Sequence, residues 1–95
     1  MYGTIARMRL KAGAEPQLQA FMRAFEHLDV HGYVGSMVYR MDTDANEYYL
    51  VVQFEDRESY RANAESPEQD ARYRAMLELL EGEPEWHDGA VVYSA

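Results

Sequence analysis

One segment constrains the fold more than any other, the run of residues 48–54, YYLVVQF. Side chains along a β-strand point alternately to opposite faces of a sheet. One face of this run carries four apolar side chains and the other begins with two: Tyr48, Leu50, Val52 and Phe54, then Tyr49 and Val51. A sheet with one wet face would alternate apolar with polar residues instead. We therefore expect helices of the same chain to cover one face and a second copy of the sheet to cover the other.

This strand is the second arm of a predicted β-hairpin. The first arm is residues 33–40, YVGSMVYR, and the connecting residues 42–47 are rich in Asp and Asn, as turns are. The connection also has the first three ligand positions of a calcium loop. Its sixth position should be Gly and is Glu47, and its twelfth should be Glu and is Gln53. We interpret the connection as a turn rather than a metal site.

The elements before the hairpin follow from periodicity. Residues 2–10 alternate as a first strand. A first helix begins near Pro16, which suits the first helical turn, and Gly32 marks the stop. Its apolar stripe has the spacing i, i+3, i+4, i+7: Leu18, Phe21, Met22 and Phe25.

Helix-capping residues indicate where the helices after the hairpin begin. Asp56 is the predicted N-cap of a short second helix. Its inward stripe would be Tyr60, Asn63 and Ala64. The sequence SPEQ at residues 66–69 is a capping-box pattern that starts a third helix over residues 67–80. A last strand is expected at residues 90–94, AVVYS.

This order, β-α-β-β-α-α-β, predicts a ferredoxin-like α+β fold. Four strands would form an antiparallel sheet with the helices on one face. The 95 residues suit one domain, residues 1–95, with a modest core.

Composition excludes several classes of partner. The net charge of −8 and the scattered basic residues argue against a nucleic-acid partner. Cysteine is absent, which excludes disulfides and thiolate chemistry. No apolar run has membrane-spanning length, and the N-terminal MYGTIARMRL lacks the apolar segment of a signal peptide. We expect a cytoplasmic protein with no membrane association.

Several stretches carry a family resemblance: RLKAGAE, YVGSMVYR, YYLVVQFED and RESYRAN, together with the long helix before the hairpin. They resemble the antibiotic-biosynthesis-monooxygenase-like domains of the dimeric α/β-barrel superfamily, over nearly the whole chain. The resemblance implies a homodimer whose two sheets pack face to face. That superfamily includes cofactor-free oxygenases of aromatic polyketides, haem-degrading enzymes and lactone isomerases.

The resemblance does not extend to haem degradation. The haem-degrading members use an Asn near the start of the first strand and a His on the last helix. Here the first strand, YGTIARMRL, has no Asn, and residues 67–80 have no His. We expect no cofactor.

The candidate site is a cleft between sheet and helices. Tyr60 and Asn63 would reach it from the second helix, Trp86 and His87 from the segment before the last strand, and Tyr33 from the hairpin. Aromatic walls with a few polar groups suit a small flat phenolic ligand. Histidine is the side chain best suited to act as a base near neutral pH, which makes His87 the candidate catalytic base. The alternative is that the tyrosines and Trp86 are core residues whose polar tips are paired.

Two further features have structural and functional interpretations. Arg7 lies in the middle of a predicted central strand, where an unpaired buried charge is very costly. It either forms an ion pair across the sheet or dimer interface, or binds a substrate oxygen. His27 and His31 have the i, i+4 spacing of two metal ligands, but His31 lies beyond the expected helix end and no third ligand is near. We expect no metal.

Two functions remain open. The first is a cofactor-independent monooxygenase of a small aromatic or polyketide-like substrate, with His87 as base and with Tyr60 and Asn63 as hydrogen-bonding groups. The second is a non-catalytic dimeric module that binds a small ligand or responds to stress, because no complete catalytic constellation is visible. A haem-binding protein is the least supported reading.

Overall fold

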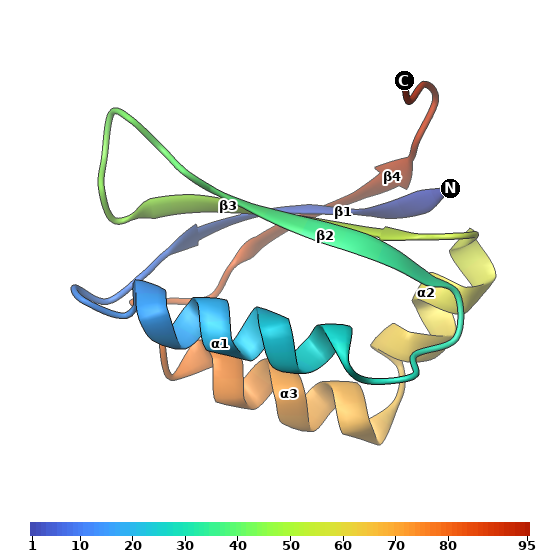
Figure 1. Cartoon of the computed structure of the whole chain (residues 1–95), viewed down its shortest axis with the longest axis horizontal. Helices are drawn as coiled ribbons and strands as arrows, with labels where there is room; N and C mark the ends of the chain where they lie inside the picture. Colours follow the sequence, from blue (N-terminus) through green and yellow to red (C-terminus); the bar gives the residue numbers. More distant parts are fainter.

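The computed structural model of residues 1–95 has the expected order of elements. These are β1 (Tyr2–Arg9), α1 (Glu15–Glu26), β2 (Tyr33–Arg40), β3 (Glu47–Phe54), α2 (Arg57–Ala64), α3 (Pro67–Leu77) and β4 (Glu85–Ala90). The antiparallel sheet has the strand order β2-β3-β1-β4. All three helices lie on one side of it, and the opposite side is bare (Figure 1). The ferredoxin-like α+β fold is confirmed.

The hydrophobic core lies between the sheet and the helices. The central strands contribute alternate residues, among them Ala6 and Met8 from β1 and Leu50 from β3, all at most 4% exposed. Leu18 of α1 and Met76 of α3 close the core from the other side. The apolar stripe of the first helix and the even positions of the third strand therefore meet as their periods predicted. None of the three helices has the length and hydrophobicity needed to cross a bilayer.

The predicted helix caps are present. Asp56 Oδ1 accepts a hydrogen bond from the Ser59 backbone N–H (2.7 Å), and Ser66 Oγ accepts one from the Gln69 N–H (3.1 Å). The returning half of the capping box is missing, because the Gln69 side chain accepts from Arg72 instead.

The third helix is shorter than predicted. It ends at Leu77, three residues before the predicted end at Leu80. Leu80 forms an isolated β-bridge with Leu10 just beyond β1, and it is 3% exposed. The helix therefore ends early because Leu80 pairs with Leu10 at the end of the first strand.

The position predicted for the last strand was wrong. β4 spans Glu85–Ala90, and residues 91–95 form no strand. β4 pairs with β1 from Glu85 opposite Arg7 to Ala90 opposite Tyr2, where β1 itself begins. Only the Val91 N–H finds a further partner, the Met1 carbonyl. The run AVVYS has a high β-propensity, but within one chain it has no neighbouring strand to pair with.

The N-cap of α2 gives a prediction that combines stability and pH. Asp56→Ala should lower the urea midpoint at pH 7, because α2 loses the acceptor for its first turn. The Ser59 hydrogen bond lowers the pKa of the Asp56 carboxyl, so its stabilisation is present above the unfolded-state pKa and is lost as the pH falls through the folded-state value. Urea unfolding at pH 7 and in acid should show this contribution shrinking.

Asp56→Asn is the matched control. Asn caps a helix about as well as Asp but does not titrate. It should keep the pH 7 midpoint and remove this part of the pH dependence. A constant difference between wild type and Asp56→Asn at every pH would contradict the assignment.

Candidate functional site

A cavity of about 380 Å³ lies between the helix-covered face of the sheet and the helices. Eleven of its 17 lining residues are hydrophobic. Phe21 and Phe25 of α1, Phe54 of β3 and Tyr73 of α3 supply aromatic walls. Its volume and largely apolar lining are those of a small-molecule site.

Helix α2 presents its predicted inward stripe to this cavity. Tyr60, Asn63 and Ala64 all line it. Asn63 Oδ1 accepts a hydrogen bond of 3.3 Å from Arg72, which leaves the amide N–H₂ without a protein acceptor. The spacing of these residues on a helix, read with the cap at Asp56, was a sufficient signal for their direction.

Trp86 forms a wall at the edge of the cavity. It lies within β4 opposite Ala6, so its side chain is on the helix-covered face. The indole is in contact with Tyr73, with ring centroids 5.9 Å apart, yet Trp86 is 41% exposed. It is therefore a partly open wall rather than a core residue.

One end of the cavity is polar. Tyr60 Oη donates a 2.8 Å hydrogen bond to Asp88 Oδ1. Burial, together with the neighbouring Asp88 carboxylate, raises the pKa of Tyr60 to about 12. Thr4 is 5% exposed, lines the cavity, and its hydroxyl has no hydrogen-bond partner. We call Thr4, Tyr60 and Asp88 the Thr4 cluster.

Sequence reasoning missed Thr4 and Asp88 as site residues. Alternation along β1 places Thr4 on the same face as Ala6 and Met8, but nothing in a sequence shows that a hydroxyl lacks a partner. Asp88 was missed because the last strand was placed too late. With β4 at Glu85–Ala90, Asp88 follows Trp86 by two residues and so shares its face.

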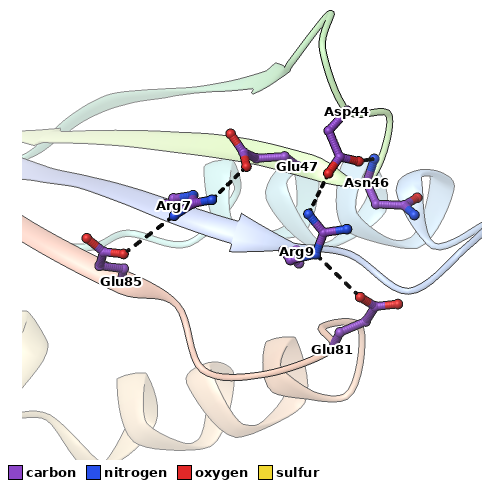
Figure 2. A network of polar contacts seen from close by, with 7 residues as sticks. All are labelled: Arg7, Arg9, Asp44, Asn46, Glu47, Glu81 and Glu85. Atoms are coloured by element: carbon purple, nitrogen blue, oxygen red, sulfur yellow. Dashed lines mark hydrogen bonds and ion pairs between the residues drawn. The ribbon is translucent and has the colours of Figure 1, made fainter.

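Two of the predicted site residues lie on the opposite, bare face. His87 pairs with Ile5 in the β1–β4 register, and its Nε2 lies 2.9 Å from Glu85 Oε1. Arg7 binds Glu47 at 2.9 Å and lies 4.0 Å from Glu85 (Figure 2). Neither side chain lines the cavity. For Arg7 the geometry matches the ion pair across the sheet.

Tyr33 lies behind the cavity wall. A register shift between Tyr33 and Gly35 in β2 puts Tyr33 and Ser36 on the same face. Their hydroxyl groups are 2.7 Å apart, and the Tyr33 ring packs edge-on against Phe25 and Phe54. Tyr33 therefore supports aromatic walls of the cavity without lining it.

The charged residues in the lining of the cavity are both acidic. Asp70 and Asp88 line it, and no Lys, Arg or His does. Asp70 pairs with Arg74, one turn later on α3, at 3.0 Å. Asp88 has no cationic partner within ion-pair distance. A bound anion would meet an uncompensated carboxylate here.

A second hollow lies along α1, between this helix and strands β2 and β3, and part of its polar lining is already paired. Tyr48 Oη donates to Glu15 Oε1 at 2.7 Å, and Arg40 donates to the same oxygen at 2.8 Å. The Tyr48 hydrogen bond, together with Arg40, lowers the pKa of the Glu15 carboxyl. These contacts tie the start of α1 to β2 and β3.

The bare face of the sheet combines an apolar row with ion pairs at one end. Met37, Val51 and Ile5 are direct neighbours across β2, β3 and β1. Met37 is 53% and Ile5 49% exposed in the single chain. Near the hairpin, Arg7 and Arg9 form ion pairs with acids of the adjoining strands and turns (Figure 2).

The chain matches the sequence profile described as "Antibiotic biosynthesis monooxygenase" over residues 1–76. The chain belongs to this family. The match ends before β4, so Trp86 and Asp88 lie outside the matched region. No curated protein sequence matches the chain.

Solved structures of family proteins share the fold. A candidate antibiotic biosynthesis monooxygenase from Bordetella bronchiseptica is 19% identical, with 97% of each chain covered and a TM-score of 0.78. A variant of SnoaB, a cofactor-independent oxygenase from Streptomyces nogalater, is 14% identical, with 98% of this chain and 94% of SnoaB covered and a TM-score of 0.77. A candidate family member from Chloroflexus aurantiacus is 20% identical, with coverages of 99% and 95% and a TM-score of 0.75. At these identities the likeness concerns the fold.

Proposed function

We propose that this chain is a cofactor-independent monooxygenase of a small aromatic or polyketide-like substrate. The observation that carries the proposal is the cavity of about 380 Å³, walled by aromatic rings and polar at one end. Membership of the family and the likeness to SnoaB, which is named a cofactor-independent oxygenase, support it. The cavity is large enough for a planar ligand, and its walls are mostly apolar.

The reaction requires little of the protein beyond holding the substrate in position. An electron-rich ring carbon loses a proton, and the carbanion reacts with O₂. One oxygen atom becomes a carbonyl in place of a CH₂ group, the other leaves as water, and the substrate supplies all the electrons. Apolar walls that orient the ring and keep water away from the carbanion suit this reaction.

The residues proposed to hold the substrate are Tyr60, Asn63 and Trp86. Trp86 would stack against the ring, and Asn63 lines the cavity with an N–H₂ group that has no protein acceptor. His87 and Arg7 lie on the other face, so in the single chain neither can touch a ligand in this cavity. The proposal therefore assigns no direct contact to either of them.

One observation favours the second candidate function, a non-catalytic ligand-binding module. No Lys, Arg or His lines the cavity, and the only carboxylates there are Asp70 and Asp88. A carboxylate is a weak base toward a phenol or a carbon acid. Such a site could hold an aromatic ligand without reacting with it.

We propose that the functional form is a homodimer formed through the bare sheet face. The row Met37–Val51–Ile5 supports this, because a monomer would leave these side chains in water. The family resemblance supports the same arrangement. The cytoplasm remains the proposed location.

An oxygen electrode tests the function. Purified protein is mixed with an anthrone, which carries the required CH₂ group, with a chelator present and with heat-denatured protein as the blank. A monooxygenase should consume O₂ above the uncatalysed rate and release the oxidised product in equal amount. Saturable quenching of Trp86, the single Trp, without added O₂ uptake would identify the binding module instead. The absence of both would leave neither function standing.

A further inference from the structure

The Thr4 cluster is held together by the sheet register and by α2. Thr4 and Asp88 are direct partners across β1 and β4, so their side chains leave the same face close together. Tyr60 reaches over from α2 and donates a hydrogen bond of 2.8 Å to Asp88 Oδ1. Three elements thus place two hydroxyl groups and one carboxylate at one end of the cavity.

The Thr4 hydroxyl lacks a partner that it should have. Most buried polar groups in proteins are hydrogen-bonded, because an unpaired one costs the desolvation of the group. Thr4 is 5% exposed, its Oγ1 is unpartnered, and the side chain lines the cavity. A polar atom of a ligand bound in the cavity would supply the hydrogen-bond partner that this hydroxyl lacks.

The Asp88 carboxylate has spare acceptor capacity. Tyr60 occupies Oδ1, and no protein group donates to Oδ2. With a pKa of about 12, Tyr60 stays protonated at neutral pH and continues to donate to Asp88. Tyr60 therefore positions the carboxylate, and the second oxygen is free to accept a hydrogen bond from a ligand.

The charge at this end restricts the ligand. Asp88 is negative and unpaired, and Asp70 adds a second acid to a lining that holds no base. A carboxylate, sulfonate or phosphate on the ligand would meet the like charge of Asp88 at this end of the cavity. A neutral hydroxyl avoids this repulsion and offers Asp88 a proton.

We propose that the Thr4 cluster is a specificity site for the hydroxyl group of an uncharged aromatic ligand. The ligand hydroxyl donates to Asp88 Oδ2, and its oxygen accepts from Thr4 Oγ1. This inference rests on the proposed function only in taking the cavity as the ligand site. It goes further in requiring a free O–H and in excluding anions.

A matched series of ligands tests the requirement for the hydroxyl. Calorimetric titrations at neutral pH would compare 1-naphthol, 1-methoxynaphthalene and 1-naphthoate. A hydrogen bond to a charged group corresponds to about tenfold or more in affinity, so 1-naphthol should bind about tenfold tighter than its methyl ether. 1-Naphthoate should bind more weakly than either. Equal affinities for the three, or tightest binding of the naphthoate, would overturn the proposal.

Two carboxylate-to-amide variants distinguish a hydrogen bond between Asp88 and the ligand from an effect of the negative charge in the lining. Asp88→Asn should weaken 1-naphthol binding about tenfold and improve binding of 1-naphthoate. Asp70→Asn, the control, removes the same charge from the lining at a residue that pairs with Arg74 instead. It should leave the preference for 1-naphthol over its methyl ether unchanged. The same loss of that preference in both variants would reduce the effect to overall charge and defeat the proposal.

Thr4→Val separates binding from stability. Val has nearly the shape of Thr but no hydroxyl, so the fold loses only an unpaired polar group. The melting temperature should stay the same or rise, while 1-naphthol affinity should fall about threefold or more. A fall in melting temperature with unchanged affinity would show a structural hydroxyl and refute the assignment. If the variant does not fold, the ligand series on the wild type still decides.

Failure of this inference can be told apart from failure of the proposed function. Preference for 1-naphthol without any O₂ uptake would retain the specificity site and remove the oxygenase. O₂ uptake on substrates that lack a hydroxyl, with no preference for 1-naphthol, would retain the oxygenase and remove the specificity site.

Discussion

Val51→Asp is expected to convert a dimer into a monomer. Val51 lies at the centre of the bare face, directly between Met37 of β2 and Ile5 of β1. In a sheet-to-sheet dimer the new carboxylate would be buried without a cation, at a cost of several kcal/mol in association free energy. Size-exclusion chromatography with light scattering at micromolar protein should give twice the 11.0 kDa chain mass for the wild type and a single chain mass for the variant.

The control places the same charge elsewhere. Leu28→Asp changes another exposed apolar residue, 43% exposed, in the turn after α1 and away from the bare face. It should remain dimeric. Far-UV circular dichroism distinguishes a folded Val51→Asp monomer from an unfolded chain. A wild type that runs as a monomer at this concentration would contradict the sheet-to-sheet dimer.

The bare face is suited to this contact by the way its charges are arranged. Arg7 and Arg9 are already paired with acids of their own chain, Glu47 and Asp44 among them, near one end of the sheet. An association surface of this kind has apolar side chains in the middle and solvated polar groups at the rim. The ion pairs would then fix orientation and contribute little free energy of their own.

The parts of the fold that sequence predicted are those that depend on local signals. Residues 48–54 alternate with apolar side chains on both faces, and β3 buries Tyr48 and Leu50 on one face and leaves Val51 on the other. Asp56 caps a helix because its side chain competes for a backbone N–H three residues away. Such signals need no knowledge of distant residues.

The parts that failed depend on distant residues. Residues 90–94 have the composition of a strand, but strand formation needs a partner, and β1 begins at Tyr2, opposite Ala90. The misplaced strand had a consequence for the site. Trp86 and His87 were assigned to the same cleft, whereas adjacent residues of a strand point to opposite faces. The correct register sends Trp86 to the cavity and His87 to the bare face.

The charged and polar residues of the site were only partly predictable. Alternation along β1 already placed Arg7 and Thr4 on opposite faces of the sheet. An ion pair was therefore a sound alternative to a substrate contact for Arg7. Which acids it would meet depended on the register of β3 and β4. The unpaired hydroxyl of Thr4 and its closeness to Asp88 follow from that same register, and a single sequence does not contain it.

Trp86→Ala is expected to weaken aromatic ligand binding by about tenfold or more, because the ligand loses a ring contact and much of a wall. The loss of stability should be smaller than the about 3–5 kcal/mol usual for a buried aromatic, since Trp86 is 41% exposed. Calorimetric titration measures the affinity, because the variant has no Trp to report by fluorescence. Urea unfolding measures the stability.

Three variants make the comparison specific. Trp86→Phe keeps a ring and should retain most of the affinity. Tyr93→Ala removes an aromatic that is 83% exposed in the tail and should change neither affinity nor stability. Phe54→Ala removes a core aromatic that is 1% exposed and should cost the full about 3–5 kcal/mol. If Trp86→Ala destabilises the chain as much as Phe54→Ala and no aromatic ligand binds the wild type, Trp86 is a packing residue and the cavity has no role in binding.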